Sequence, residues 1–434
     1  MRILKKAKDL LTNEIIYILA DVIVKAIAFI SLPFFLKIMT TSAYGEYSLY
    51  QTYVNVFTVF FCLNITTGVV RYYVDRENEK KHLTTAIWII LGFGIFSSLV
   101  LYIEEVLFGF MNISGKVVLA ICVCIIFGSI FQLGLEDIRA RMKTLQYAVF
   151  SLIYTILSTV LGLILVYNMK YELGYWRLVS ITITTVLLGL IMSVKVIKRD
   201  GFTFNKETAK YLLVYSVPLI QYTFSSIVIS QINRVFLANN GLSEVGIFSF
   251  ASNLAMMMYI IAISINRAFQ PFLFKALKHS DNYKKRMYQN MLLFYFIYVV
   301  FLFSIDILIW IFGNKEYSKA SAVIPVLVLG YGILYLYSII SNFMYYYKKN
   351  HVLSIYSIIS AGIIVILNAI LIPLYGYIGA GIAICLAYFS LFMMGISYCK
   401  RKLQIVIFSS KMIIISIIAL VIPVVIKLWI GGIL

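Results

Sequence analysis

The chain has 434 residues, of which 62% are hydrophobic and 13% charged, whereas soluble domains average about 25% charged residues. Its mean hydropathy of +0.95 excludes a soluble globular protein and predicts one that is embedded in lipid. The formal net charge of +19 would suit a nucleic-acid-binding protein, but the basic residues lie between apolar runs, so we expect no nucleic-acid partner and interpret the charge as a topology signal.

Apolar runs long enough to cross a bilayer, about 20 residues each, recur along the whole chain. We predict spans over residues 12–38, 46–70, 83–103, 116–135, 146–168, 173–196, 209–238, 245–272, 288–313, 319–346, 351–373, 376–398 and 408–430. Lipid offers no partner to backbone N–H and C=O groups, so each span must be an α-helix. The predicted fold class is therefore all-α integral membrane protein, with twelve helices, or thirteen if 408–430 also crosses.

The lysines and arginines gather in every second connection between the spans, and these connections all lie on one side of the membrane. If the N-terminus is cytoplasmic, 27 of them fall in cytoplasmic segments and only seven in outward segments. Cytoplasmic loops of membrane proteins carry this excess of Lys and Arg. The pattern predicts a multi-pass protein of the bacterial inner (cytoplasmic) membrane with its N-terminus inside.

An internal repeat relates the two halves of the chain. Ser42-Ala43-Tyr44-Gly45-Glu46-Tyr47-Ser48 follows the first span, and Ser243-Glu244-Val245-Gly246-Ile247-Phe248-Ser249 follows the seventh, at an offset of 201 residues. Spans one and seven run in the same direction, so the repeat is parallel. This layout is typical of transporters in which two lobes rock around a central site, and we expect two parallel six-helix lobes around a central cavity.

The repeat also suggests domain boundaries. We expect an interfacial N-terminal helix at 1–11, an N-lobe at 12–196, a cytoplasmic linker at 197–210 and a C-lobe at 211–398. An extra C-terminal membrane helix would follow at 408–430. No hydrophilic stretch between the spans is long enough to fold as a soluble domain.

Residues that could perform catalysis are sparse. The three histidines (His82, His279 and His351) each lie beside a basic cluster, and we interpret them as solvated. The carboxylate pair Glu104-Glu105 is interpreted as a solvated turn. All five cysteines lie in or at the ends of spans, which indicates neither a disulfide framework nor a zinc site. We therefore expect no enzyme activity, no metal and no cofactor.

Polar and charged residues inside the spans are better candidates for function. A charge near the centre of a membrane helix costs about 2.5–3.5 kcal/mol, so such residues usually face a bundle interior or a cavity. Asp21 and Lys25 are spaced i,i+4 and could form an ion pair. The seventh span carries a polar stripe of Ser226, Ser230, Asn233 and Arg234, the second carries Gln51 and Asn55 and ends toward Arg71, and the eighth carries Arg267.

A cavity with basic side chains suits an anionic substrate, and phosphate or pyrophosphate fits well. We assign this role to Lys25, Arg234 and Arg267. The remaining residues would line the cavity or couple an ion: Asp21, Gln51, Asn55, Ser226, Ser230 and Asn233. The alternative for each is interhelical hydrogen bonding, or snorkelling of long side chains to the interface.

Four passages give the chain a resemblance to a known family. They are Leu32-Pro33 followed by Tyr44-Gly45-Glu46-Tyr47, then Tyr215-Ser216-Val217-Pro218-Leu219, then Asn233-Arg234 leading to Val245-Gly246-Ile247-Phe248, and finally 367–373 with Gly376, Gly379 and Ala380. With these passages the chain resembles the polysaccharide-repeat-unit flippases (Wzx type) of the multidrug/oligosaccharidyl-lipid/polysaccharide exporter superfamily.

The resemblance implies a function without chemistry on the substrate, in which basic residues of a cavity meet a diphosphate. Lys25 and Arg234 match such positions in kind, and Arg71 and Arg267 match them more loosely. Such a protein would move an undecaprenyl-diphosphate-linked oligosaccharide between leaflets by alternating access, for O-antigen, lipopolysaccharide or capsule synthesis. Its partners would be the lipid-linked glycan, membrane lipids, and a glycan polymerase with a chain-length regulator. Two alternatives stay open: an ion-coupled small-molecule (MATE-like) exporter, and a membrane-embedded glycan polymerase, which would be expected to carry a large outward loop with catalytic Arg or His.

Overall fold

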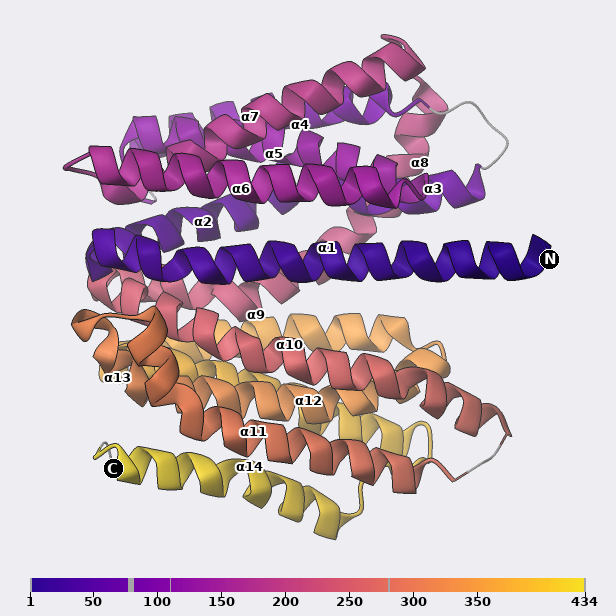
Figure 1. The fold of residues 1–434 in the computed structure, drawn as a ribbon, viewed down its shortest axis with the longest axis vertical. Coiled ribbons are helices and arrows are strands. Elements are labelled where there is room, and N and C mark those ends of the chain that lie inside the picture. Colours follow the sequence, from indigo (N-terminus) through magenta and orange to yellow (C-terminus); the bar gives the residue numbers. More distant parts are fainter. Residues whose placement is uncertain (1, 77–81, 110, 280–281, 433–434) are drawn as a thin grey trace. The chain divides into compact units, whose positions relative to one another are not determined.

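The computed structural model describes residues 2–76, 82–109, 111–279 and 282–432, and all the regular structure in these residues is helical (Figure 1). The α-helices are α1 (Arg2–Ile38), α2 (Thr41–Phe61), α3 (Val69–Asp75), α4 (Thr84–Phe108), α5 (Gly115–Ala140), α6 (Thr144–Asn168), α7 (Leu173–Asp200), α8 (Lys206–Ser216), α9 (Ile220–Ala238), α10 (Leu242–His279), α11 (Lys284–Phe312), α12 (Ile324–Tyr346), α13 (Asn350–Arg401) and α14 (Ser410–Ile430). Short 3₁₀ segments are η1 (Ile65–Gly68), η2 (Val217–Leu219) and η3 (Lys315–Ala322). The predicted all-α class is confirmed.

The helices account for the predicted spans. Eleven helical segments of the described chain are long and apolar enough to cross a membrane, and twelve if α2 and α3 form one span bent by 59°. α13 is itself two helices that meet at Gly376, where φ is 54° and ψ is −135°. Each half is longer than the about 20 residues that a span requires. With the halves counted separately, the described residues provide the thirteen predicted spans.

Local sequence explains where the helices break. Gly376 has a left-handed backbone that glycine adopts freely, and a Cβ at this position would lie 2.6 Å from a Glu244 carboxylate oxygen. Pro218 lies in η2, between α8 and α9, because a proline ring cannot donate the helical hydrogen bond. Between α2 and η1, Asn64 adopts φ 53°, a conformation that asparagine tolerates better than most residues.

The described chain forms two compact units. Unit 1 comprises Met1–Met39 and Leu49–Phe224, and unit 2 comprises Thr40–Ser48 and Ser225–Leu434. The first turns of α2 therefore group with unit 2, although the rest of that helix belongs to unit 1. The predicted linker at 197–210 lies within unit 1, and its role as a linker stays a prediction. α1 is one continuous helix from Arg2, so an interfacial role for residues 1–11 also stays a prediction.

The centre of unit 1 is α5. In the most apolar stretch of α5, 72% of the residues are buried, whereas in the corresponding stretch of α6 only 28% are buried. Glycines allow α7 to approach α5 closely, because a Cβ on Gly134 would lie 2.6 Å from the Met192 side chain and one on Gly189 would lie 2.7 Å from the Phe127 carbonyl oxygen. Phe131 and Leu188 pack in the core between these two helices.

The centre of unit 2 is α12, which is buried to the same extent as α5, 72%. α12 packs against α10 and α13, and its Tyr335 ring stacks on Phe294 of α11 at 3.8 Å between centroids. The Tyr298 hydroxyl of α11 donates a hydrogen bond to the Leu420 carbonyl at 3.0 Å, so α14 is held within the unit. α5 and α12 are the fourth and tenth spans, which are equivalent positions in the predicted repeat.

Candidate functional site

Arg234 is the most enclosed of the four cations that the sequence assigns to an anionic substrate. It lies half-buried on α9, and its Nε donates a hydrogen bond to Ser249 Oγ of α10 at 2.9 Å. The hydroxyls of Tyr44, Tyr47 and Tyr331 interact with it electrostatically. No carboxylate of the described residues forms an ion pair with Arg234. A cation held in this way can receive an anion.

Tyr44, one of the tyrosines near Arg234, is held in place at the start of α2. Asn253 Nδ2 donates a hydrogen bond to the Tyr44 hydroxyl at 2.7 Å, and the Tyr44 ring meets Tyr317 edge-on at 6.3 Å between centroids. The backbone N–H of Thr41 donates to a Glu316 carboxylate oxygen at 3.2 Å. A carboxylate at a helix N-terminus is favourable, so Glu316 holds this end of α2 within unit 2.

The two copies of the repeated motif pack directly on one another inside unit 2. A Cβ on Gly45 would lie 1.8 Å from the Leu242 carbonyl oxygen, and one on Gly246 would lie 2.0 Å from the Thr41 carbonyl oxygen. Thr41 Oγ1 and Ser243 Oγ share a hydrogen bond of 2.9 Å. The sequence predicts the correspondence of the two segments. It does not predict their contact.

The predicted polar stripe on α9 divides in the structure. Ser226 and Ser230 are exposed, and the Ser230 hydroxyl donates back to the Ser226 carbonyl at 3.0 Å, as serines in membrane helices often do. Asn233 is fully buried, and neither of its amide atoms has a partner in the described chain; the same holds for Asn368 on α13. Asn368 has two sequence signals: it is a polar residue within an apolar span, and it lies in the passage 367–373 that carries the family resemblance.

Lys25 and Asp21 lie on α1, in unit 1, and both are exposed. The ion pair predicted from their i,i+4 spacing is wrong, because the two side chains do not meet; Asp21 Oδ1 instead accepts a hydrogen bond from the Tyr147 hydroxyl at 3.4 Å. An exposed lysine in a span must reach water or headgroups with its long side chain. Lys25 is available for either role.

Gln51, Asn55 and Arg71 also belong to unit 1. Gln51 Nε2 donates to Asn55 Oδ1 at 3.5 Å along α2. Arg71 Nε donates to an Asp75 carboxylate oxygen at 2.9 Å, and the Tyr211 hydroxyl donates to the same carboxylate at 2.7 Å. Arg71 is therefore already balanced by a carboxylate, which makes it a weaker candidate for substrate phosphate than Arg234.

Arg267 on α10 is exposed and has no ion pair within the described residues. Its neighbour Asn266 has a structural role. Asn266 Nδ2 donates to the Ser338 carbonyl at 3.3 Å and its Oδ1 accepts from Asn342 Nδ2 at 2.8 Å, so it joins α10 to α12. Polar pairs of this kind hold membrane helices together.

Three charged residues near the ends of spans are buried: Glu105, Arg177 and Lys427. Glu105 accepts hydrogen bonds from the backbone N–H groups of residues 111 and 113, both at 2.8 Å, so it closes the α4–α5 connection. Arg177 donates to the Ser158 carbonyl at 2.6 Å. Lys427 of α14 forms an ion pair with Asp306. These residues tie segments together inside their units, and the interpretation of Glu105 as part of a solvated turn is wrong.

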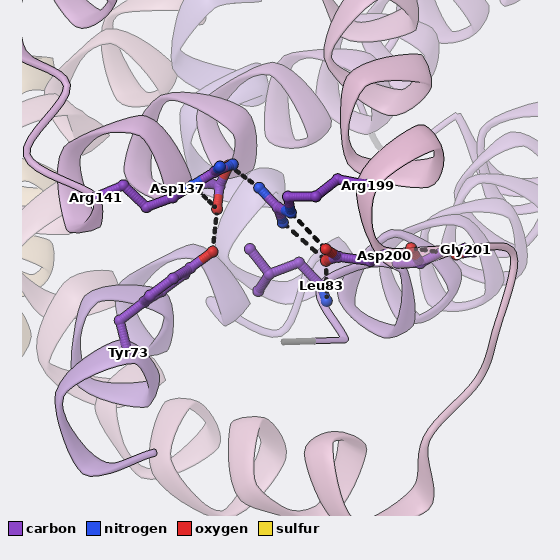
Figure 2. Close-up of polar contacts among 8 residues, drawn as sticks. Tyr73, Leu83, Asp137, Arg141, Arg199, Asp200 and Gly201 are labelled. Carbon is purple, nitrogen blue, oxygen red and sulfur yellow. Dashed lines mark hydrogen bonds and ion pairs between the residues drawn. The ribbon is translucent and has the colours of Figure 1, made fainter. Parts of the chain in front are cut away.

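A network of charges that sequence reasoning missed lies at the end of unit 1 where the predicted cytoplasmic segments meet (Figure 2). Its centre is Asp137 of α5, which is 3% exposed. Asp137 accepts hydrogen bonds from the Tyr73 hydroxyl, from Arg141 and, at 2.7 Å, from Arg199 Nη1. Two arginines thus neutralise one buried carboxylate.

The same network extends to the end of α7. Arg199 Nη2 donates to Asp200 Oδ2 at 2.8 Å, and the Leu83 backbone N–H donates to that oxygen at 2.9 Å (Figure 2). Thr84 Oγ1 donates to the Gly201 carbonyl at 2.8 Å. The start of α4 is therefore fixed to the end of α7 by charged and polar groups together.

Each unit also contains a cavity at this end, which we call the basic end because the predicted cytoplasmic lysines and arginines lie there. The cavity in unit 1 has a volume of about 130 Å³ and is lined by Tyr72, Arg76, His82, Asn205, Glu207, Thr208 and Tyr211. The cavity in unit 2 is larger, about 320 Å³.

Comparison with known proteins gives the chain its relatives. A family model described as polysaccharide biosynthesis protein matches residues 10–277. A putative protein of the Lsg locus of Haemophilus influenzae is 21% identical over 358 residues, which cover 79% of this chain and 86% of that protein. A second membrane protein from the same organism, of uncharacterized function, is 21% identical over 359 residues, covering 80% of this chain and 86% of its own length.

The solved structures show the fold. The lipid II flippase MurJ in an inward closed conformation is similar with a TM-score of 0.73 and 15% identity, over 96% of this chain and 98% of MurJ. An inward-facing MATE multidrug transporter of the MOP superfamily is similar with a TM-score of 0.58 and 14% identity, over 86% of this chain and 93% of that protein. The predicted fold of the exporter superfamily is confirmed by these two similarities.

The family model covers more than half of the chain, and the chain has the fold of a flippase and of a multidrug transporter. It is a multi-pass membrane protein that belongs to the polysaccharide biosynthesis protein family.

Proposed function

We propose that the protein is a flippase that moves undecaprenyl-diphosphate-linked oligosaccharide repeat units across the cytoplasmic membrane by alternating access. One observation carries the proposal most directly. Arg234 is held half-buried in unit 2, with tyrosine hydroxyls around it and no carboxylate partner among the described residues. A guanidinium binds a phosphate oxygen pair well, and phenolic hydroxyls can donate to and accept from sugar hydroxyls. A diphosphate-linked oligosaccharide would provide both the phosphate oxygens and the sugar hydroxyls.

The family and the fold support a lipid-linked substrate. The description of the family is polysaccharide biosynthesis protein, and the structural relative MurJ is a lipid II flippase. The family description and this structural relative together favour a substrate that the membrane itself carries. We propose that the glycan serves a surface polysaccharide such as O-antigen, lipopolysaccharide or capsule, and that a glycan polymerase and a chain-length regulator act after it.

Lys25 is the second cation of the proposed substrate path. It is exposed on α1 and forms no ion pair with a described residue, so it is available to a phosphate without breaking a native contact of that kind. Arg71 would have to leave Asp75 first, so we give it a lesser role. We propose that the N-terminus and the basic ends face the cytoplasm, where the repeat unit is assembled, and that Arg234 and Lys25 meet its diphosphate in turn.

The test is deletion of the gene in its own host, with assay of surface polysaccharide and of lipid-linked repeat units on each leaflet. We expect loss of surface polymer and repeat units trapped on the cytoplasmic leaflet. Complementation with Arg234→Ala should fail, and Arg234→Lys should restore part of the export because the charge is retained. Arg401→Ala, which removes an exposed arginine at the end of α13, is the matched control and should complement fully.

Two outcomes would contradict the proposal. Repeat units that reach the outer leaflet without being polymerised would indicate a polymerase. Unchanged surface polysaccharide in a host without a redundant flippase would exclude both, and efflux assays with small molecules would then test the MATE-like alternative.

A further inference from the structure

The cavity of unit 2 lies where α10 ends and α11 begins. It has a volume of about 320 Å³, which is enough for a small ligand or a headgroup. Residues 280 and 281 lie outside the described residues. The lining residues are Phe269, Phe272, Leu273, Lys275, Ala276, His279, Asn282, Tyr283 and Arg286.

The described lining of this cavity is basic. Lys275 and Arg286 line it together with His279, and none of the described residues that line it is a carboxylate. Neither Lys275 nor Arg286 takes part in an ion pair with any described residue. The cavity of unit 1 differs, because Glu207 lines it beside Arg76. Two cations that line one concave site, neither of them in an ion pair with a described residue, favour an anion.

The same cavity has an apolar floor. Phe269 and Leu273 are buried beneath it, and the Arg286 guanidinium lies over the Phe272 ring, 3.7 Å from its centroid. This cation–π contact holds the guanidinium at the cavity while its remaining N–H groups stay available. Burial raises the pKa of the Tyr283 hydroxyl above its ordinary value, so this group remains a protonated donor at neutral pH.

An apolar strip leads from the cavity along α11 toward the middle of the span. Leu293 is seven residues beyond Arg286, which places it on the same face of the helix two turns away. Leu293 is 50% exposed and Phe296 68% exposed. The cavity therefore joins a charged pocket to an exposed apolar surface, as an amphipathic ligand requires.

We propose that this cavity binds the phosphate headgroup of an anionic phospholipid of the bilayer. Arg286 and Lys275 contact the phosphate, Asn282 and Tyr283 donate hydrogen bonds to its oxygens or to the glycerol, and an acyl chain lies along Leu293 and Phe296. Basic pockets between membrane helices bind anionic headgroups in this way. The lipid would be a bound regulator or anchor of unit 2, distinct from any transported glycan.

The test is native mass spectrometry of the full-length protein in detergent, titrated with phosphatidylglycerol or with phosphatidylcholine. We expect wild type to retain phosphatidylglycerol in preference to phosphatidylcholine. Lys275→Gln combined with Arg286→Gln should weaken phosphatidylglycerol binding roughly 30-fold, the equivalent of about 1 kcal/mol for each basic residue. The same elution volume in size-exclusion chromatography would show that the variant is folded.

The control variant removes the same two charges from the same end of unit 2. Lys400 and Arg401 at the end of α13 are exposed and line neither cavity, so Lys400→Gln with Arg401→Gln should bind phosphatidylglycerol as wild type does. An equal loss in both variants would mean general surface attraction and would overturn the proposal. Displacement of the lipid by equimolar inorganic phosphate would assign the cavity to the free anion instead.

Discussion

The basic ends of the two units carry the same kind of residue and use it differently. In unit 1, carboxylates balance the arginines: Asp137 binds Arg141 and Arg199, and Asp75 binds Arg71. In unit 2, none of the described lysines and arginines at this end forms an ion pair. An excess of basic residues marks both ends as equivalent in topology. Only the structure shows that one set of charges stabilises the fold and the other is available to ligands.

The difference has a physical cause. A carboxylate that is buried beside two guanidiniums has lost most of its solvation by water, so ion pairs with the guanidiniums must compensate for that loss. Asp137 is 3% exposed and Asp200 4% exposed, and both lie where α5 and α7 pack closely. At the start of α11 the charged side chains are exposed and water or headgroups solvate them, so no partner is required.

The largest effect should come from breaking the network of unit 1. Asp137→Asn would leave Arg141 and Arg199 without their shared carboxylate, and removal of one partner of a buried ion pair costs about 3 kcal/mol or more. We expect a clear fall in the thermal unfolding temperature of the protein in detergent. Asp75→Asn is the matched control, because exposed pairs contribute little. Equal stability of the two variants would contradict a structural role for the network.

A smaller effect is expected at the opposite end of unit 2, where its contacts are tight. Gly246→Ala places a methyl group 2.0 Å from the Thr41 carbonyl oxygen, and overpacking of this kind costs about 1–3 kcal/mol. Gly362→Ala, which meets no atom within 4 Å, should be neutral or slightly stabilising. The measurement is the unfolding temperature together with export in the complemented host. If Gly246→Ala behaves like Gly362→Ala, the crossing of α2 and α10 is not tight.

The smallest effect tests how Arg286 contributes. Arg286→Lys keeps the charge and gives up the planar contact with Phe272, and a cation–π contact at an exposed site contributes about 0.5–1 kcal/mol. We expect phosphatidylglycerol binding to weaken only a few-fold in the mass-spectrometric titration. This loss is much smaller than the one expected for the variant that carries both Lys275→Gln and Arg286→Gln. Phe272→Leu should have a similar effect, because it removes the ring and leaves the charge. If Arg286→Lys lost as much phosphatidylglycerol affinity as the double glutamine variant, the shape of the guanidinium and not its charge would decide binding.

The membrane spans could be predicted from sequence because their signal is local. Runs of apolar residues fix each helix, and even the break within α13 falls at Gly376, between the two predicted spans. The charged contacts could not be predicted. Asp21 and Lys25 have the same spacing as Asp137 and Arg141, yet only the second pair forms. What differs is burial, and burial depends on neighbours such as Arg199, which is 62 residues away from Asp137 in the chain.

The candidate site was predicted in part for the same reason. Arg234 stands out as a charge within an apolar span, but its surroundings come from α2, α10 and α12. Arg177 and Lys427 have equally polar side chains near span ends and turn inward to bind Ser158 and Asp306. No pattern in one segment tells which direction a side chain takes when the partner lies in a distant helix.

The contact between Gly45 and Gly246 has a consequence for how this protein can evolve. Duplicated segments ordinarily diverge, because each copy is free to accumulate changes. Here each glycine faces the backbone of the other copy, since a side chain on either one would collide with a carbonyl oxygen. A larger residue at one position cannot be compensated by a smaller residue at the other, because no residue is smaller than glycine. We expect the two positions to remain glycine together in descendants of this chain, long after the sequences around them have drifted apart.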